Sequence, residues 1–291
     1  MTEDEKLMCG IIAKISETNA PIVFKGALIT KLILAEQGFT ELQRITTDID
    51  SNWVGDPPTM EFLENTLNNS LGGLRSDYTI VATRTYAEKK SAGFNVMSNS
   101  TGTVVCKLDM SIKPVIGDKT YHFADFAIKG VLPNEILADK ISIMSSDYIF
   151  RRMKDMVDVY ALSSCIAVKS NDILDIVDKK QRTIQEFNGF YTRKQDLEVA
   201  YNKLKRITGK PDFADIYAYM TKFIEPFARL PDGQAEKTSP VCPRLPDGQG
   251  TGRKNLTWNA KTKIWTGEPI QQSKPKPKKP TSNKKSYYND R

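Results

Sequence analysis

Long apolar runs are missing from this 291-residue sequence. No stretch approaches the roughly 20 residues that a membrane-spanning helix needs, and the first residues, Met-Thr-Glu-Asp-Glu-Lys, are too acidic and polar for a secretory signal. We therefore expect a cytoplasmic protein with no membrane partner. Because 40% of the residues are hydrophobic, the chain can still bury a full core.

Histidine and paired cysteines are also scarce. The sequence has one histidine, His122, and four cysteines, none of which form a CxxC pair. This composition argues against a zinc site built from Cys and His, and we expect neither a metal nor another cofactor. A Ser–His or Cys–His dyad could use only His122. That residue lies in an apolar, strand-like run and is better explained as a packed core residue.

Excess positive charge is absent from most of the chain, although the formal net charge is +7. Seven Lys or Arg and one Asp lie between residue 274 and the end, which leaves 35 basic and 34 acidic residues elsewhere. The main part is nearly neutral, so its charge does not indicate a nucleic-acid-binding domain. Any affinity for nucleic acid is predicted to belong to the basic tail, whose Lys-Pro alternation cannot bury enough apolar area to fold.

Apolar spacing predicts an α+β domain. Period-two or continuous apolar runs predict strands at 10–15, 78–85, 103–108 and 121–128, and a hairpin formed by 165–168 and 173–177. Helical spacing predicts helices at 25–37, 57–71, 145–157, 197–207 and 213–224. This order of elements fits a layered α+β domain better than a βαβ repeat. We divide the chain into a solvated leader (1–8), an α+β domain (9–228) and a Pro/Gly/Lys-rich tail (229–291) with room for one hairpin at 255–265.

Cys9 is the first candidate for chemistry. A cysteine at a mature N-terminus needs no histidine, because its own α-amine can take the thiol proton. This arrangement suits a chain with one histidine, but it requires removal of residues 1–8 by cleavage between Met8 and Cys9. The structural alternative is that Cys9 is a small buried apolar residue.

Four segments, in chain order, resemble the class II glutamine amidotransferases, which are N-terminal-nucleophile hydrolases. Cys9-Gly10-Ile11 resembles the start of the mature family members. The other three are Ala-Thr-Arg at 82–84, the loop Ala-Ile-Lys-Gly-Val-Leu-Pro-Asn at 127–134, and Ser-Asp-Tyr at 146–148. The resemblance implies a layered α/β/β/α sandwich over about residues 9–228.

The resemblance also implies roles for five residues. Cys9 would attack the side-chain amide of glutamine, Arg84 would bind the substrate carboxylate, and Asp147 would bind its ammonium group. The Gly130 amide, together with Lys129, would hold the oxyanion. Lys129 stands where the family has asparagine. Since no acceptor domain follows, the ammonia would go to a separate acceptor or synthase protein.

A second hypothesis is a non-catalytic binding or structural protein, of viral or phage type, that keeps the same fold with a decayed site. Its basic tail would contact nucleic acid or an assembly partner. Lys129 in place of asparagine and the uncut leader favour this hypothesis. Under it, Arg84 is a surface or salt-bridging arginine and Asp147 is only a helix cap.

Overall fold

The computed structural model describes residues 1–86, 91–228, 257–259 and 264–266. The chain forms two units, Met1–Thr238 and Ser239–Arg291. The helices of the first unit are α1 (Glu3–Ser16), α2 (Gly26–Glu36), α3 (Met60–Ser70), α4 (Pro133–Met144), α5 (Met153–Cys165), α6 (Ser170–Lys179), α7 (Asn188–Thr192), α8 (Lys194–Asn202) and α9 (Phe213–Ala228). Two short 3-10 helices, η1 (Gly72–Ser76) and η2 (Ile149–Arg151), accompany them.

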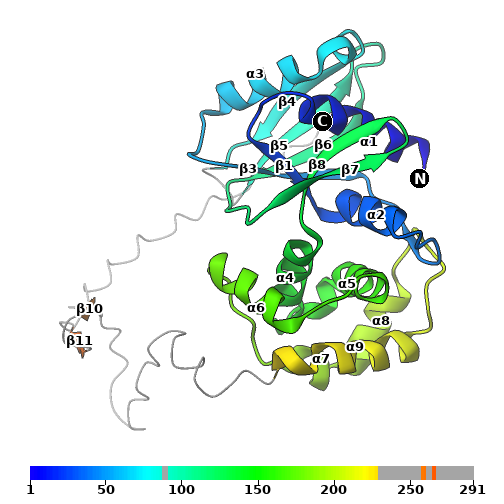
Figure 1. The fold of residues 1–291 in the computed structure, drawn as a ribbon, viewed down its shortest axis with the longest axis vertical. Coiled ribbons are helices and arrows are strands. Elements are labelled where there is room, and N and C mark those ends of the chain that lie inside the picture. The colour runs from blue at the N-terminus through cyan, green and yellow to red at the C-terminus, as the bar shows by residue number, and fades with distance from the viewer. Residues whose placement is uncertain (87–90, 229–256, 260–263, 267–291) are drawn as a thin grey trace, which may run out of the picture. The chain divides into compact units, whose positions relative to one another are not determined.

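One seven-stranded mixed sheet organises the first unit (Figure 1). Its order is β4 (Tyr78–Arg84), β5 (Ser91–Ser98), β6 (Val104–Ser111), β3 (Asp48–Trp53), β1 (Ile22–Lys25), β8 (Phe126–Val131) and β7 (Asp118–Phe123). The pairs β3–β6 and β1–β8 are parallel and the other neighbours are antiparallel. A small separate pair joins β2 (Gln43–Arg44) to β9 (Ile207–Thr208).

Helices cover the sheet on both sides. Helix α1 packs against β8 and β1 and α3 against β4, whereas α2 packs against β3 and β7. In the view of Figure 1, α1 and α3 lie above the strands, and α2 lies below them with the helical group α4–α9. Alternate residues of β5 and β6, such as Phe94 and Leu108, are buried because strand side chains point to opposite faces in turn.

The prediction of a strand at 10–15 is wrong, because these residues belong to α1. Thr2 caps the helix: the Glu5 amide donates to the Thr2 hydroxyl and the Thr2 amide donates to the Glu5 carboxylate. The buried residues Met8, Ile11, Ile12 and Ile15 have helical spacing. The apolar run read as a strand is therefore the inner face of a helix, and residues 3–8 are its first turns.

Two further predictions need correction. Residues 165–168 and 173–177 do not form a hairpin; they contain the end of α5 and half of α6. The predicted α/β/β/α sandwich is also wrong, because the described residues contain one large sheet with helices on both faces. The expectation rested on motif likeness, and strand order depends on long-range pairing that local motifs do not fix.

In the second unit the structure describes two short strands. β10 (Thr257–Asn259) and β11 (Ile264–Thr266) pair antiparallel, with Trp258 opposite Trp265. They lie in the range where the sequence left room for a hairpin. The remaining predictions for 229–291, including contact of the basic tail with nucleic acid, concern residues outside the described part.

Candidate active site

Cys9 lies in the interior of α1 and is completely buried. Burial raises the pKa of its thiol to about 12, and the nearby Glu5 carboxylate adds to this shift. Its Sγ atom lies 3.8 Å from Sδ of Met1. In this chain Cys9 therefore carries a protonated, enclosed thiol, the opposite of what a nucleophile requires.

The other four residues predicted for an amidotransferase site are spread over the unit. Arg84 lies on β4, and Lys129 and Gly130 lie on β8, with four strands between. At about 4.8 Å per strand this separation is roughly 24 Å. Asp147 is exposed, between α4 and η2. Within the described residues these groups do not line a shared pocket.

Arg84 and Gly130 have local roles instead. The Arg84 guanidinium donates to the Ser91 carbonyl at 3.0 Å and to the Asp109 carboxylate at 2.5 Å. A Cβ atom at Gly130 would lie 2.9 Å from the ring of Tyr121, so a glycine is needed there for packing. The geometry explains both residues without a substrate.

A polar pocket opens elsewhere, where β1 and β3 meet the start of α2. Strands β1 and β3 run antiparallel with Lys25 opposite Asp50. Helix α2 begins directly after Lys25, at Gly26, whose φ is +72°. A Cβ atom at Gly26 would lie 2.1 Å from Oδ2 of Asp50, so only glycine allows the helix N-terminus to approach this carboxylate.

Three aspartates gather at this end of the sheet. Asp48 and Asp50 alternate on β3, so both point to the same face, and both line the pocket. Asp109 lies directly opposite Asp50 on the neighbouring strand β6, which places it on that face too. Asp109 forms an ion pair with Arg84 and does not line the pocket.

The pocket encloses about 380 Å³ between the sheet and the helical group. Helices α4 and α5 and the segments beside them supply a wall rich in cations. The charged residues of this wall are Asp139, Lys140, Arg151, Arg152, Lys154, Asp155 and Arg182. The pocket thus has carboxylates on one side and an excess of cations on the other.

Burial shifts the pKa values of the two groups at the centre of the sheet side, Asp50 and Lys25. Burial raises the pKa of Asp50 to about 6, and the charge of Asp48 acts in the same direction. Burial lowers the pKa of Lys25 to about 8, against the opposing attraction of Asp50. The Lys25 ammonium donates to Oδ1 of Asn52 at 2.5 Å. Two central groups that titrate between pH 6 and 8 are typical of a functional site.

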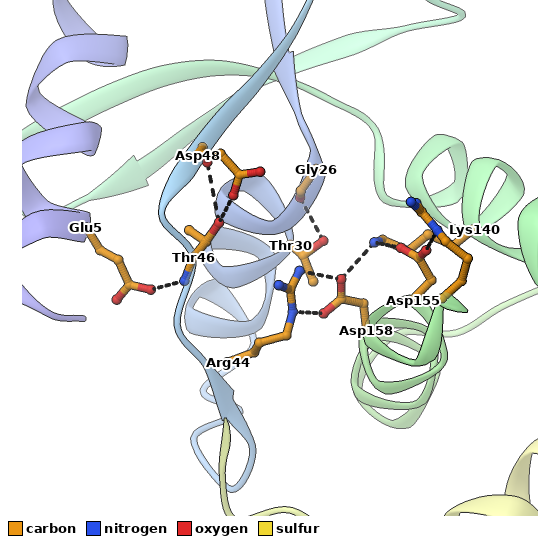
Figure 2. Close-up of polar contacts among 10 residues, drawn as sticks. Glu5, Gly26, Thr30, Arg44, Thr46, Asp48, Lys140, Asp155 and Asp158 are labelled. Atoms are coloured by element: carbon orange, nitrogen blue, oxygen red, sulfur yellow. Dashed lines mark hydrogen bonds and ion pairs between the residues drawn. The ribbon is translucent and has the colours of Figure 1, made fainter. Parts of the chain in front are cut away.

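A chain of ion pairs fixes the cationic wall (Figure 2). Arg44 of β2 donates twice to Asp158 of α5, at 2.9 and 2.8 Å. Lys140 of α4 donates to Asp158 at 2.7 Å and to Asp155 at 2.9 Å. Burial would raise the pKa of Asp158, but the charges of Lys140 and Arg44 lower it overall. The network therefore ties β2 to α4 and α5 and fixes the positions of Arg44, Lys140 and Asp155, which line the pocket.

A second set of contacts reaches the carboxylate side. The Glu5 carboxylate accepts a hydrogen bond from the Thr46 amide at 3.0 Å, and the Thr46 hydroxyl donates to the Asp48 carboxylate at 3.0 Å (Figure 2). Glu5 also accepts from the Lys31 ammonium at 2.6 Å. Helix α1 is thus linked through Thr46 to a pocket aspartate.

The donor set fits a divalent cation that is shared with a phosphate ligand. Among the described residues no three Asp, Glu, His or Cys side chains form a complete metal site. Mg²⁺, however, is usually bound by one or two carboxylates, with the rest of its shell from water and substrate phosphates. Asp48 and Asp50 supply such a pair, and Lys25 and the α2 N-terminus lie beside them.

Comparison with known proteins identifies the family. The model of the nucleotidyl transferase AbiEii toxin family, of the Type IV toxin–antitoxin systems, matches residues 8–235, more than half of the chain. The chain belongs to this family. No curated protein matches it significantly.

Comparison with solved structures concerns the fold alone. MenT4, the nucleotidyltransferase toxin Rv2826c from Mycobacterium tuberculosis H37Rv, aligns with a TM-score of 0.50 and 14% identity, covering 80% of this chain and 85% of that one. An antigenic nucleotidyltransferase-like protein from Paracoccidioides brasiliensis aligns with a TM-score of 0.40 and 15% identity, covering 68% of this chain and 92% of that one. The first of these shows a shared nucleotidyltransferase fold.

These findings correct the functional predictions. The AbiEii family match overturns the amidotransferase resemblance, glutamine as a substrate and a synthase as the acceptor of ammonia. It equally overturns the non-catalytic and viral alternative. None of the described helices is long and apolar enough to cross a membrane.

The sequence patterns described above do not predict the pocket residues. Their signal was a buried strand ending in Lys25-Gly26, followed by Asp48 and Asp50 with one apolar residue between them.

Proposed function

We propose that this protein is a nucleotidyltransferase toxin that transfers a nucleotide from a nucleoside triphosphate to an acceptor. The observation that carries the proposal is the pocket itself. Asp48 and Asp50 lie beside Lys25 and the N-terminus of α2, and they face a wall that carries Arg151, Arg152 and Lys154. Both the family and the fold are consistent with this chemistry.

The pocket suits a triphosphate because its cations and its carboxylates act on different parts of the ligand. Among the described contacts, Arg151 and Lys154 form no ion pair, so they are available for phosphate oxygens. Asp48 and Asp50 would hold the divalent cation, which, when bound, offsets phosphate charge and polarises the reacting phosphoryl group. The first amides of α2 add partial positive charge next to Lys25.

In the reaction, an acceptor oxygen or nitrogen forms a bond to the α-phosphorus while the bond to the bridging oxygen breaks and pyrophosphate leaves. Lys25 and the cationic wall, with Arg151, Arg152 and Lys154, hold the departing phosphates. The proton of the acceptor is released to solvent. Little covalent chemistry is asked of the protein, so positioning and charge stabilisation provide most of the rate.

The test is transfer of label from α-³²P nucleoside triphosphates, with Mg²⁺, to total RNA and protein. Asp48→Asn and Asp50→Asn should each lower transfer by about 100-fold or more, because each removes several kcal/mol of metal-dependent stabilisation. Asp118→Asn is the control, since that carboxylate is 40% exposed and lies 3.8 Å from Lys129, outside the pocket. Transfer that survives both pocket substitutions would contradict the proposal.

As a toxin of a toxin–antitoxin family, the protein is expected to stop growth when it is produced without its antitoxin. Induced expression in a host lacking the antitoxin should arrest growth, and the Asp50→Asn variant should not. If the wild type and Asp50→Asn arrested growth equally, toxicity would not depend on nucleotidyl transfer, and the proposed link between them would be contradicted.

A further inference from the structure

An aromatic side chain stands exposed next to the pocket. Tyr148 precedes η2, and with 63% of its surface exposed it is the most exposed large apolar residue of the described part. Arg151, three residues later, lines the pocket. The guanidinium carbon of Arg151 lies 5.6 Å from the centroid of the Tyr148 ring. Arg151 thus connects the exposed Tyr148 ring to the cationic wall of the pocket.

The neighbouring ring differs from Tyr148 in its surroundings. Phe150 lies 6.3 Å from Tyr148, centroid to centroid, and carries Arg193 over its ring at 4.2 Å as well as Arg151 at 5.6 Å. Phe150 therefore has cations from two segments on it. Tyr148 carries Arg151 and leaves most of its surface to solvent.

The residues on either side of Tyr148, Asp147 and Ile149, are fixed by packing. Ile149 is completely buried. The backbone of Asp147 packs against Gly189 so closely that a Cβ atom there would lie 2.8 Å from the Asp147 Cα. Because its neighbours on both sides are fixed, the exposure of Tyr148 is built into the fold.

We propose that Tyr148 is the base-stacking residue for the incoming nucleoside triphosphate, and that Arg151 links the base site to the phosphate site. This inference rests on the proposed function. In a nucleotide only the ribose separates the base from the α-phosphate, and only 5.6 Å separates the Tyr148 ring from the Arg151 guanidinium. One nucleotide can therefore use both side chains. Cations around the ring suit a ligand with negative charge, and every base offers a face for stacking on an aromatic ring.

Binding measurements with two probes test the proposal on the full chain. Calorimetry with Mg²⁺ compares each of the four nucleoside triphosphates with inorganic tripolyphosphate, which has no base. Tyr148→Ala should weaken binding of the nucleotides by about 5- to 150-fold, the range for loss of one base–aromatic stack. Binding of tripolyphosphate should not change. Tyr148→Trp and Tyr148→Phe should keep nucleotide affinity, because both retain an aromatic face.

Phe62→Ala is the matched control, since Phe62 is 55% exposed and packs edge-on against Trp53, away from the pocket. Unchanged nucleotide affinity in Tyr148→Ala would overturn the inference. An equal loss of tripolyphosphate affinity would also overturn it, because the effect would then be structural. If an unpaired RNA oligonucleotide bound less tightly while nucleotide affinity held, the ring would belong to the acceptor, and the inference would fall. Wild-type protein that binds neither probe would refute the proposed function itself.

Discussion

Replacing Glu5 with glutamine removes the negative charge that faces the Lys31 ammonium at 2.6 Å inside the first unit. The Glu5 side chain is completely buried, and that of Lys31 is 10% exposed. Glutamine has nearly the same shape but only one acceptor oxygen, whereas the Thr2 and Thr46 amides donate to different oxygens of Glu5, at 2.9 and 3.0 Å. The change therefore removes the charge together with one of the two acceptors, and we expect it to destabilise the fold.

The magnitude follows from the burial of the pair. Removing one partner of a buried ion pair costs about 3–5 kcal/mol, since the other charge is left uncompensated. We expect the lower value, about 3 kcal/mol, because the slight exposure of Lys31 lets its ammonium move toward water. For a unit of this size that loss corresponds to a fall in Tm of about 6–12 °C. It is also a large share of the 5–15 kcal/mol typical of a folded domain.

Urea unfolding followed by circular dichroism measures the loss. Glu3→Gln is the control: Glu3 lies in the same helix turn, its side chain is 87% exposed, and it pairs with Lys6 at 2.8 Å. An exposed pair of this kind contributes little to stability, because solvent screens it. A difference between the two variants below about 1 kcal/mol would refute the reasoning.

The pH dependence of the Glu5 effect provides a second check. Burial alone would raise the pKa of Glu5, but hydrogen bonds from Lys31, Thr2 and Thr46 lower it below its ordinary value. The stabilisation is then fully present above the pKa of the unfolded state, about 4.3, and is lost as pH falls through the lower folded value. The wild type and Glu5→Gln should therefore converge in stability in acid and differ most near neutral pH.

Three further predictions concern the pocket. The pKa of Asp50 is raised to about 6, so its ionised carboxylate destabilises the folded state above that pH. Asp50→Asn should therefore raise the free energy of unfolding at pH 7.5 by about 1–3 kcal/mol in urea titrations, while it removes activity. A loss of stability would contradict this account. Because the pKa of Lys25 is lowered to about 8, tripolyphosphate affinity should fall above pH 8 in calorimetry, and Lys25→Met should lack this step. Thr46→Val should raise the Mg²⁺ concentration needed for half-maximal transfer by about 10-fold, whereas Thr46→Ser, which keeps the hydroxyl bonded to Asp48, should not.

Several elements could be predicted from the sequence because their signals are local. The helices expected at 25–37, 57–71 and 213–224 correspond to α2, α3 and α9, whose apolar faces repeat with helical spacing. The strand expected at 121–128 is two strands instead, β7 and β8, which turn at Ala124 with a φ of +48°. Asp125 alone marks the turn in that run, since neither glycine nor proline interrupts it.

The pocket could be predicted only in part, because its two sides come from distant segments. Asp48 and Asp50 share a strand, and their alternation alone places both on one face. A pair of acids two residues apart is also common on exposed strands, so the pair has little meaning until its cationic partners are known. Arg151 and Lys154 lie about 100 residues later in the sequence, after the rest of the sheet and α4, and only the folded chain brings them to the pocket.

Gly26 would have been the more specific signal. A helix that begins with glycine gains no cap from its side chain and loses backbone entropy, so local propensity gives no reason for glycine here. The structure supplies the reason: any Cβ atom at this position would overlap the carboxylate of Asp50. In the segments that resembled an amidotransferase the corresponding constraint is local, since Gly130 is required by the ring of Tyr121 on the neighbouring strand. When local structure gives no reason for a glycine, the reason can be a distant side chain that packs against it. Gly26 is such a case, because the Asp50 carboxylate occupies the space of its missing Cβ atom.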